Sequence, residues 1–143
     1  MTIAKVLLVD DETPFVETMI KRLNKREVEI IPAYNGQEAL DQLQKHPHIE
    51  VVILDIKMPV MDGMEALSKI KAKHPLVEVI MLTGHATVET GIDGMKMGAF
   101  DYLMKPCNTE ELVRKVRQAA ARKRQHETKI MEARLKTITL RRP

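Results

Sequence analysis

The sequence predicts an α/β fold in which one parallel, five-stranded sheet carries helices on both faces. Five short apolar runs alternate with five segments whose apolar residues recur at helical spacing. The run Val51–Leu54 is wholly apolar, which is typical of a strand buried on both faces. This alternation implies parallel strands joined by right-handed crossovers. A length of 143 residues favours one domain with one core.

The N-terminal quarter of the chain predicts two strands and the helix between them. Residues 5–9 form a mainly apolar run that leads into three acidic residues. Thr13 precedes a proline and suits an N-cap, so we expect a helix over residues 14–26. Residues 28–33 form a weaker strand. Pro32 places that strand at an edge of the sheet, because proline cannot donate to a central ladder.

The central part of the chain predicts two helices around the most apolar strand. Asn35 is followed by a glycine and begins a helix, which stops before a His-Pro pair. The strand over residues 51–54 comes next and ends at Asp55. Asp62, also followed by glycine, begins the third helix, and a second His-Pro pair stops it.

The remaining elements repeat the same pattern. Residues 77–82 form a fourth apolar strand that ends at a Thr-Gly pair, and residues 87–97 form a helix. Residues 98–104 give a short fifth strand. Thr109 and the two glutamates after it are a capping pattern, which predicts the start of the last helix.

Composition and charge exclude several classes of protein. With 44% hydrophobic and 30% charged residues, the chain resembles an ordinary globular protein rather than a disordered one. Its longest apolar runs are far too short to cross a membrane, and the N-terminus has no secretory pattern. The single cysteine, Cys107, cannot form an internal disulfide. We therefore expect a cytoplasmic protein with no membrane partner.

Five polar side chains follow the ends of the predicted strands. Asp10 and Asp11 follow the first strand, Asp55 the third, Thr83 the fourth and Lys105 the fifth. The carboxyl ends of parallel strands share one rim of a sheet, so we expect these side chains to converge. Three close carboxylates repel one another unless a cation joins them, and Mg²⁺ suits an all-oxygen site. A carboxylate, Mg²⁺, an ammonium and a hydroxyl together suit the acceptance of a phosphoryl group.

Four short motifs, in this order and at these strand ends, resemble the receiver domain of two-component response regulators. The resemblance covers roughly residues 3–123 and implies a doubly wound, flavodoxin-like (βα)5 sheet with strand order 2-1-3-4-5. The motifs are Asp10-Asp11, Leu54-Asp55-Ile56-Lys57-Met58-Pro59 with Asp62-Gly63, Thr83-Gly84, and Lys105-Pro106.

The resemblance implies a role for each matched residue. Asp55 resembles the phosphoacceptor, which attacks a phosphohistidine on a partner kinase to form an acyl phosphate. Asp10 and Asp11 resemble the Mg²⁺ ligands, completed by Asp55 and the backbone carbonyl of Lys57. Lys105 resembles the lysine that pairs with the carboxylate and then with the phosphoryl oxygens. The proline after it matches one that follows a cis peptide in this family.

A conformational switch is also implied. Thr83 resembles the hydroxyl that moves to the phosphoryl group, and Tyr102 the aromatic ring that then turns inward. The fourth helix contains Gly91 and Gly94, each costing roughly 1 kcal/mol against alanine, so we expect it to be the softest helix. We expect the surface of the fourth helix, fifth strand and fifth helix to change on phosphorylation and to signal to a partner.

The implied partners are a sensor histidine kinase or a histidine phosphotransfer protein, and an unknown downstream protein. Homodimerisation on phosphorylation stays open. We expect a switch that catalyses at most its own phosphorylation and dephosphorylation. An aspartate-nucleophile phosphatase is the rival, but such enzymes carry a second acid where this chain has Lys57. A docking module that works without phosphorylation is the third hypothesis, against which Asp55 and Lys105 argue.

The charge of the chain is split between its two parts. Residues 1–111 carry 12 Lys and Arg against 18 Asp and Glu, whereas residues 112–143 carry 11 against 2. The domain pattern fades past about residue 121. We therefore expect a receiver domain over residues 1–121 and a basic C-terminal helical tail over residues 122–143, with no recognisable output domain.

The tail has three interpretations. We favour a solvated extension of the last helix that frays toward its end. A linker cut from an absent output domain comes second. A nucleic-acid-binding segment comes third, because the tail has neither aromatic residues nor a second helix-turn-helix unit. We therefore do not expect nucleic acid as a partner.

Overall fold

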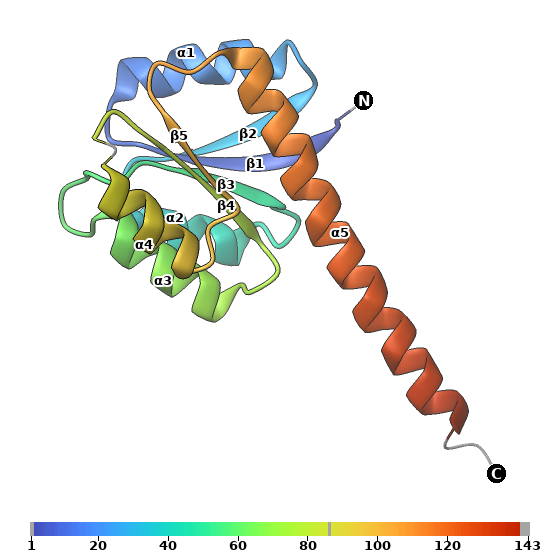
Figure 1. Cartoon of the computed structure of the whole chain (residues 1–143). Helices are drawn as coiled ribbons and strands as arrows, with labels where there is room; N and C mark the ends of the chain where they lie inside the picture. The colour runs from blue at the N-terminus through green and yellow to red at the C-terminus, as the bar shows by residue number, and fades with distance from the viewer. Residues whose placement is uncertain (1, 86, 141–143) are drawn as a thin grey trace.

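Five parallel strands form one sheet in the order β2-β1-β3-β4-β5 (Figure 1). The computed structural model describes residues 2–85 and 87–140. The predicted α/β class and strand order are confirmed. In chain order the elements are β1 (Ala4–Val9), α1 (Thr13–Asn24), β2 (Val28–Ala33), α2 (Gly36–Lys45), β3 (Val51–Leu54), α3 (Gly63–Lys73), β4 (Glu78–Thr83), α4 (Val88–Lys96), β5 (Asp101–Met104) and α5 (Thr109–Leu140).

The sheet is covered on both faces because side chains alternate along each strand. In β1, Leu7 points into a core that includes residues of α2 and α3. Its neighbour Leu8 points into a second core that includes residues of α1 and α5. Figure 1 shows the same division, with α1 and α5 on one side of the sheet and α2, α3 and α4 on the other. The buried runs predicted from the sequence therefore form a doubly wound core.

β2 lies at one edge of the sheet, as Pro32 predicts. Among the described strands, β1 is its one neighbour. The proline can be accommodated there because an edge strand leaves one row of backbone groups outside the ladder. Among the described residues, no helix combines the length and the apolar character that crossing a bilayer requires.

Two predicted helix caps are wrong. Thr13 is the first residue of α1 and Glu12 occupies the N-cap, because the N–H of Val16 bonds the carbonyl of Glu12 at 3.0 Å. Thr109 is likewise helical, and the cap of α5 is Asn108. The side-chain oxygen of Asn108 accepts hydrogen bonds from the backbone of Glu110 and Glu111, at 2.8 and 3.2 Å.

Other element boundaries differ by a few residues. The predicted helix over residues 14–26 stops at Asn24, and Glu27 just beyond it adopts a left-handed φ of 64°. β5 begins only at Asp101, because the chain first leaves α4 through Gly98, whose φ of +100° suits a glycine.

α5 is one continuous helix to Leu140, well past the end of the domain pattern near residue 121. The predicted helical tail is helical through the last described residue, and the fraying expected toward Pro143 stays a prediction. The end of the tail, residues 141–143, lies outside the described residues. Figure 1 shows the second half of α5 projecting away from the sheet.

Candidate functional site

Three aspartates converge at the carboxyl end of the sheet. Asp10 directly follows β1 and Asp55 directly follows β3, and they are 1% and 3% exposed. Asp11 is exposed beside them. One carboxylate oxygen from each of the three lies within 4.8 Å of the others. The predicted convergence is therefore confirmed for these three side chains.

Lys105 reaches into this cluster from the end of β5. Its Nζ lies 2.6 Å from Asp10 Oδ2, 3.8 Å from Asp55 Oδ2 and 3.4 Å from Glu12 Oε1. The ammonium also lies over the ring of Phe15, 4.0 Å from its centroid. The peptide bond from Lys105 to Pro106 is cis, as the resemblance implied. The contact with Phe15 could not be predicted from the sequence, because it depends on how α1 is placed relative to the residue that follows β5.

Burial and close charges shift the pKa values of two side chains in this cluster, Asp10 and Lys105. Burial is the largest influence on Asp10 and raises the pKa of its carboxyl above 3.8, although the hydrogen bond from Lys105 acts in the opposite direction. For Lys105, burial lowers the pKa, but the bond to Asp10 and the charges of Asp10 and Asp55 outweigh it and hold the pKa above 10.5. An oxygen-only set of three carboxylates fits a hard divalent cation such as Mg²⁺.

The loop after Asp55 is held by backbone contacts. The N–H of Ile56 donates to Asp55 Oδ1 at 2.8 Å, which fixes one oxygen of that carboxylate. Gly63, the first residue of α3, donates to the carbonyl of Ile56 at 2.5 Å. A side chain on Gly63 would collide with the backbone of Asp55 and Ile56. The glycine therefore lets α3 start directly against the aspartate's own backbone.

Thr83 and Tyr102 lie on the neighbouring strands β4 and β5, and the carbonyl of Thr83 accepts a hydrogen bond of 2.9 Å from the backbone N–H of Lys105. Thr83 ends β4, is fully buried, and its hydroxyl accepts a hydrogen bond of 3.0 Å from the backbone N–H of His85. Tyr102 lies on β5 and is half-buried. Its hydroxyl shares a hydrogen bond of 2.6 Å with Thr90 Oγ1, in the first turn of α4.

α4 is attached to Tyr102 through its N-terminal cap. Thr87 and Thr90 bond each other's backbone N–H in a capping box. The ring of Tyr102 lies beneath the helix, where a methyl group added to Gly91 or Gly94 would be 3.7 Å away. The predicted soft helix is therefore in direct contact with the predicted switch tyrosine. The bond between Tyr102 and Thr90 was not predicted, since neither residue marks its partner in the sequence.

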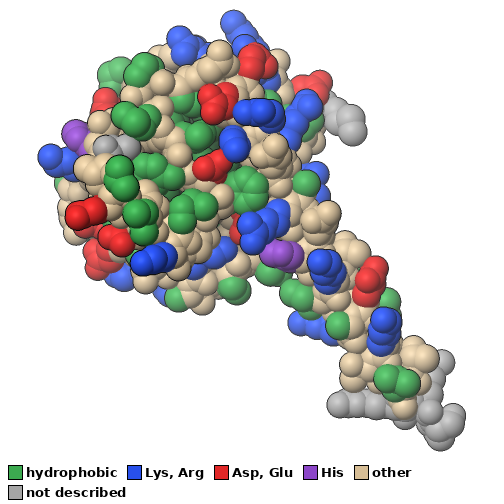
Figure 2. Space-filling model, in the orientation of Figure 1, with side chains coloured by type: hydrophobic (Ala, Val, Ile, Leu, Met, Phe, Trp, Pro, Cys, Tyr) green, Lys and Arg blue, Asp and Glu red, His purple; other side chains and the backbone are tan. Residues whose placement is uncertain are grey.

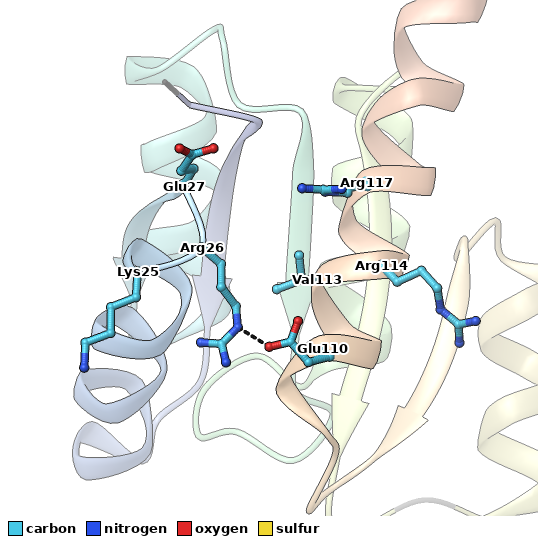
Figure 3. Close-up of a pocket in the computed structure, with 7 residues that line it drawn as sticks. All are labelled: Lys25, Arg26, Glu27, Glu110, Val113, Arg114 and Arg117. Carbon is cyan, nitrogen blue, oxygen red and sulfur yellow. Dashed lines mark hydrogen bonds and ion pairs between the residues drawn. The ribbon is translucent and has the colours of Figure 1, made fainter.

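Two open hollows differ in their relation to the aspartates. One, of about 460 Å³, adjoins Asp11 and is lined also by Glu12, Lys57, Met58, Pro59 and His85. Lys57 is exposed there. The other lies between α5 and the residues that follow the C-terminal end of α1 (Figure 3). Arg26 points at Glu110 there, and Arg114 points away. Only the first hollow gives an incoming group access to the carboxylates.

Comparison with known proteins identifies the family of the chain. The response regulator receiver domain model matches residues 6–117. The transcriptional regulatory protein YesN of Bacillus subtilis is 38% identical over 137 residues, which cover 92% of this chain and 37% of that protein. The chain thus spans well under half of this relative.

Similar solved structures support the same family assignment. A response regulator receiver domain protein from Clostridium thermocellum matches with a TM-score of 0.81 and 36% identity, covering 85% of this chain and 98% of that chain. A CheX–CheY complex from Borrelia burgdorferi with BeF3 and Mg²⁺ matches with a TM-score of 0.75 and 31% identity, covering 79% and 86%. The chain therefore belongs to the response regulator receiver domains, the family of two-component signalling modules that accept a phosphoryl group.

Proposed function

We propose that Asp55 accepts a phosphoryl group from a phosphohistidine on a sensor histidine kinase or a histidine phosphotransfer protein. The observation that carries the proposal is the cluster of three carboxylates within 4.8 Å, with the ammonium of Lys105 beside it. An oxygen of Asp55 attacks phosphorus, and the phosphorus–nitrogen bond breaks with its electron pair left on the histidine ring. The product is an acyl phosphate on Asp55.

Mg²⁺ is the proposed cofactor. Asp10, Asp11, Asp55 and the backbone carbonyl of Lys57 would hold it, an oxygen ligand set of the kind that leaves room for water and phosphate oxygens. The related complex from Borrelia contains Mg²⁺ together with BeF3. Bound there, the ion would offset the negative charge that a phosphoryl group brings to three carboxylates.

Lys105 and Thr83 would respond to the new charge. A phosphoryl group adds nearly two negative charges and strong acceptor oxygens. The Lys105 ammonium, now closer to Asp10 than to Asp55, would turn toward those oxygens. The Thr83 hydroxyl would leave the N–H of His85 and donate to one of them.

Movement of Thr83 would then reach α4. The loop between β4 and α4 would follow Thr83, and Tyr102 would release Thr90 and turn into the space that Thr83 leaves. The exposed side chains of α4 and β5 include Val88, Ile92 and Met104, which a downstream protein would meet. We propose this surface, with α5, as the output face of a switch that has no substrate other than its own phosphoryl group.

The experiment is incubation of the whole chain with acetyl phosphate and Mg²⁺, followed by intact mass measurement. We expect one phosphoryl group per chain, and none with Asp55→Asn. Asp62→Asn is the matched control, because Asp62 is an exposed cap of α3 and should leave the adduct unchanged. Rapid turnover of p-nitrophenyl phosphate without a stable adduct would instead indicate a phosphatase and would contradict the proposal.

A further inference from the structure

The second half of α5 leaves the domain and is exposed to solvent all round. The last strong attachment is Arg124, whose guanidinium bonds Glu50 at 2.6 and 2.8 Å and the carbonyl of Ile3 at 3.0 Å. Every described residue from 127 to 140 is exposed. This segment nevertheless carries five large apolar side chains, 39–85% exposed: Ile130, Met131, Leu135, Ile138 and Leu140. Figure 2 shows hydrophobic and basic side chains interspersed along it.

Such a segment is not a stable helix by itself. Isolated helices of this length are marginal in water, and most helical stability comes from packing an apolar face. The exposed side chains also continue the stripe that α5 packs against the sheet. Steps of three or four residues lead from buried Val116 and Ala120 through Lys123 and Glu127 to Ile130, Arg134 and Ile138. The same face of α5 is therefore covered inside the domain and uncovered beyond it.

Arg134 lies in the middle of this uncovered stripe without an anionic neighbour on its own helix. The positions three and four residues away are Ile130, Met131, Thr137 and Ile138. In the described part of the chain Arg134 makes no ion pair. The carboxylate on the same face is two turns earlier, at Glu127, roughly 10 Å along the axis and out of reach within one chain.

We propose that the α5 extension, residues 127–140, pairs with the extension of a second copy of the chain. The two helices run antiparallel about a two-fold axis beside Ile130 and Met131. An axis there brings Glu127 of each copy, which already pairs with Lys123 of its own helix at 3.0 Å, against Arg134 of the other copy, so that two Glu127–Arg134 pairs form across the interface. Ile130 of one copy then packs on Met131 of the other at the centre. The stripe is thus self-complementary in charge and in apolar content.

The arrangement also fits the place where α5 leaves the domain. With Glu127 against Arg134, the same register sets Ile138 of the second helix beside Lys123. A hollow of about 350 Å³ lies there, between α5 and the amino-terminal end of the sheet, with Lys123 and Glu127 in its wall. The side chain of Ile138 of the second copy would enter this hollow.

Other arrangements satisfy the stripe less well. Two parallel helices in register would set Arg134 against itself at the centre of the interface, where like charges are costly. On a membrane, Arg134 would lie in the middle of the inserted face. In the antiparallel dimer Arg134 faces Glu127 of the second copy, which avoids both the like-charge contact and the insertion of Arg134 into a membrane.

The dimer is independent of phosphorylation. Glu50 and Glu78, which bond Arg124 and Arg122 of α5, lie at the amino-terminal ends of β3 and β4, opposite to Asp55 and Thr83. The α4 surface stays free for a downstream protein. The extension would thus hold two receiver domains together whether or not either carries a phosphoryl group.

The test is the mass of the whole chain in solution, by light scattering over a wide range of concentration, with and without acetyl phosphate. We expect a dimer whose dissociation constant does not change on phosphorylation. Arg134→Glu and Glu127→Arg should each weaken it roughly tenfold or more, since two pairs become like-charge contacts. The double variant should restore it. Lys136→Glu, the same charge change away from the stripe, should have little effect.

Disulfide formation distinguishes the two directions, in a Cys107→Ser background. Ile130→Cys should cross-link two copies, whereas Ile138→Cys should not, because the antiparallel register separates its two copies by many residues. A monomer at every concentration, a double variant as weak as the single ones, or cross-linking through Ile138→Cys would each overturn the proposal. So would binding to anionic vesicles by a chain that stays monomeric in solution.

Discussion

Gly63→Ala should displace the phosphoacceptor without touching its side chain. A methyl group at Gly63 would lie 2.6 Å from Ile56 Cα and 2.8 Å from the carbonyl carbon of Asp55. The closest contact of all would be with the carbonyl oxygen of Asp55, and ordinary contacts begin near 3.4 Å, so the backbone of this loop must retreat by more than about 0.8 Å. Overpacking of this kind costs about 1–3 kcal/mol. A reacting group displaced by about 1 Å loses up to roughly 100-fold in rate.

Gly36→Ala is the matched control, because Gly36 begins α2 after an Asn cap just as Gly63 begins α3 after an Asp cap. Its methyl group would meet the side chain of Met61, with the sulfur at 2.7 Å, which is flexible and can move aside. The assays are urea unfolding and the initial rate of phosphorylation by acetyl phosphate. We expect both to fall for Gly63→Ala and to change little for Gly36→Ala. Wild-type stability and rate in Gly63→Ala would refute the reasoning.

Three further predictions concern the switch and the metal site. Gly91→Ala and Gly94→Ala should each raise the free energy of unfolding by up to about 1 kcal/mol, since the methyl group would sit 3.7 Å from the Tyr102 ring; destabilisation in urea would count against this. Tyr102→Phe removes the hydrogen bond to Thr90, costing about 0.5–1.5 kcal/mol, and should speed amide exchange in the first turn of α4; unchanged exchange would argue that the bond does not hold the helix. Mg²⁺ at a hundredfold excess over its Kd should stabilise the fold by about 2.7 kcal/mol. Because burial raises the pKa of Asp10 above 3.8, this gain should fade on acidification at a higher pH than for an ordinary aspartate, and titration calorimetry at several pH values would detect it. In the metal-free protein the raised pKa of Asp10 acts with the opposite sign: ionised Asp10 costs stability above that pKa, and the cost is relieved as pH falls through it.

The positions of the site residues could be predicted because parallel strands have one carboxyl rim. Asp10 and Asp55 each follow a run of buried apolar residues, so the ends of β1 and β3 could be located to within a residue. Pro32 allowed β2 to be placed at an edge of the sheet for a similarly local reason, because proline has no N–H to donate. Such features depend on neighbours in the sequence, which is why the fold and the convergence of the aspartates were predictable.

What could not be predicted depends on contacts between distant segments or on competition between neighbouring caps. Asn108 displaced Thr109 as the cap of α5 because its side chain reaches two backbone N–H groups, a choice that the sequence left balanced. The bond between Tyr102 and Thr90 needs β5 and α4 to be placed first. The helical extension of α5 past residue 121 was predicted, but its continuation to Leu140 was not, because the apolar residues of the tail keep only an imperfect helical spacing.

The most direct test of the central claim is to locate the phosphoryl group by peptide mapping after reaction with acetyl phosphate. The account predicts one phosphoryl group, on the peptide that contains Asp55, formed with Mg²⁺ and lost when EDTA removes the metal. A phosphoryl group on the peptide with Asp10 and Asp11, or an adduct on Asp55 that forms equally well in EDTA, would contradict it.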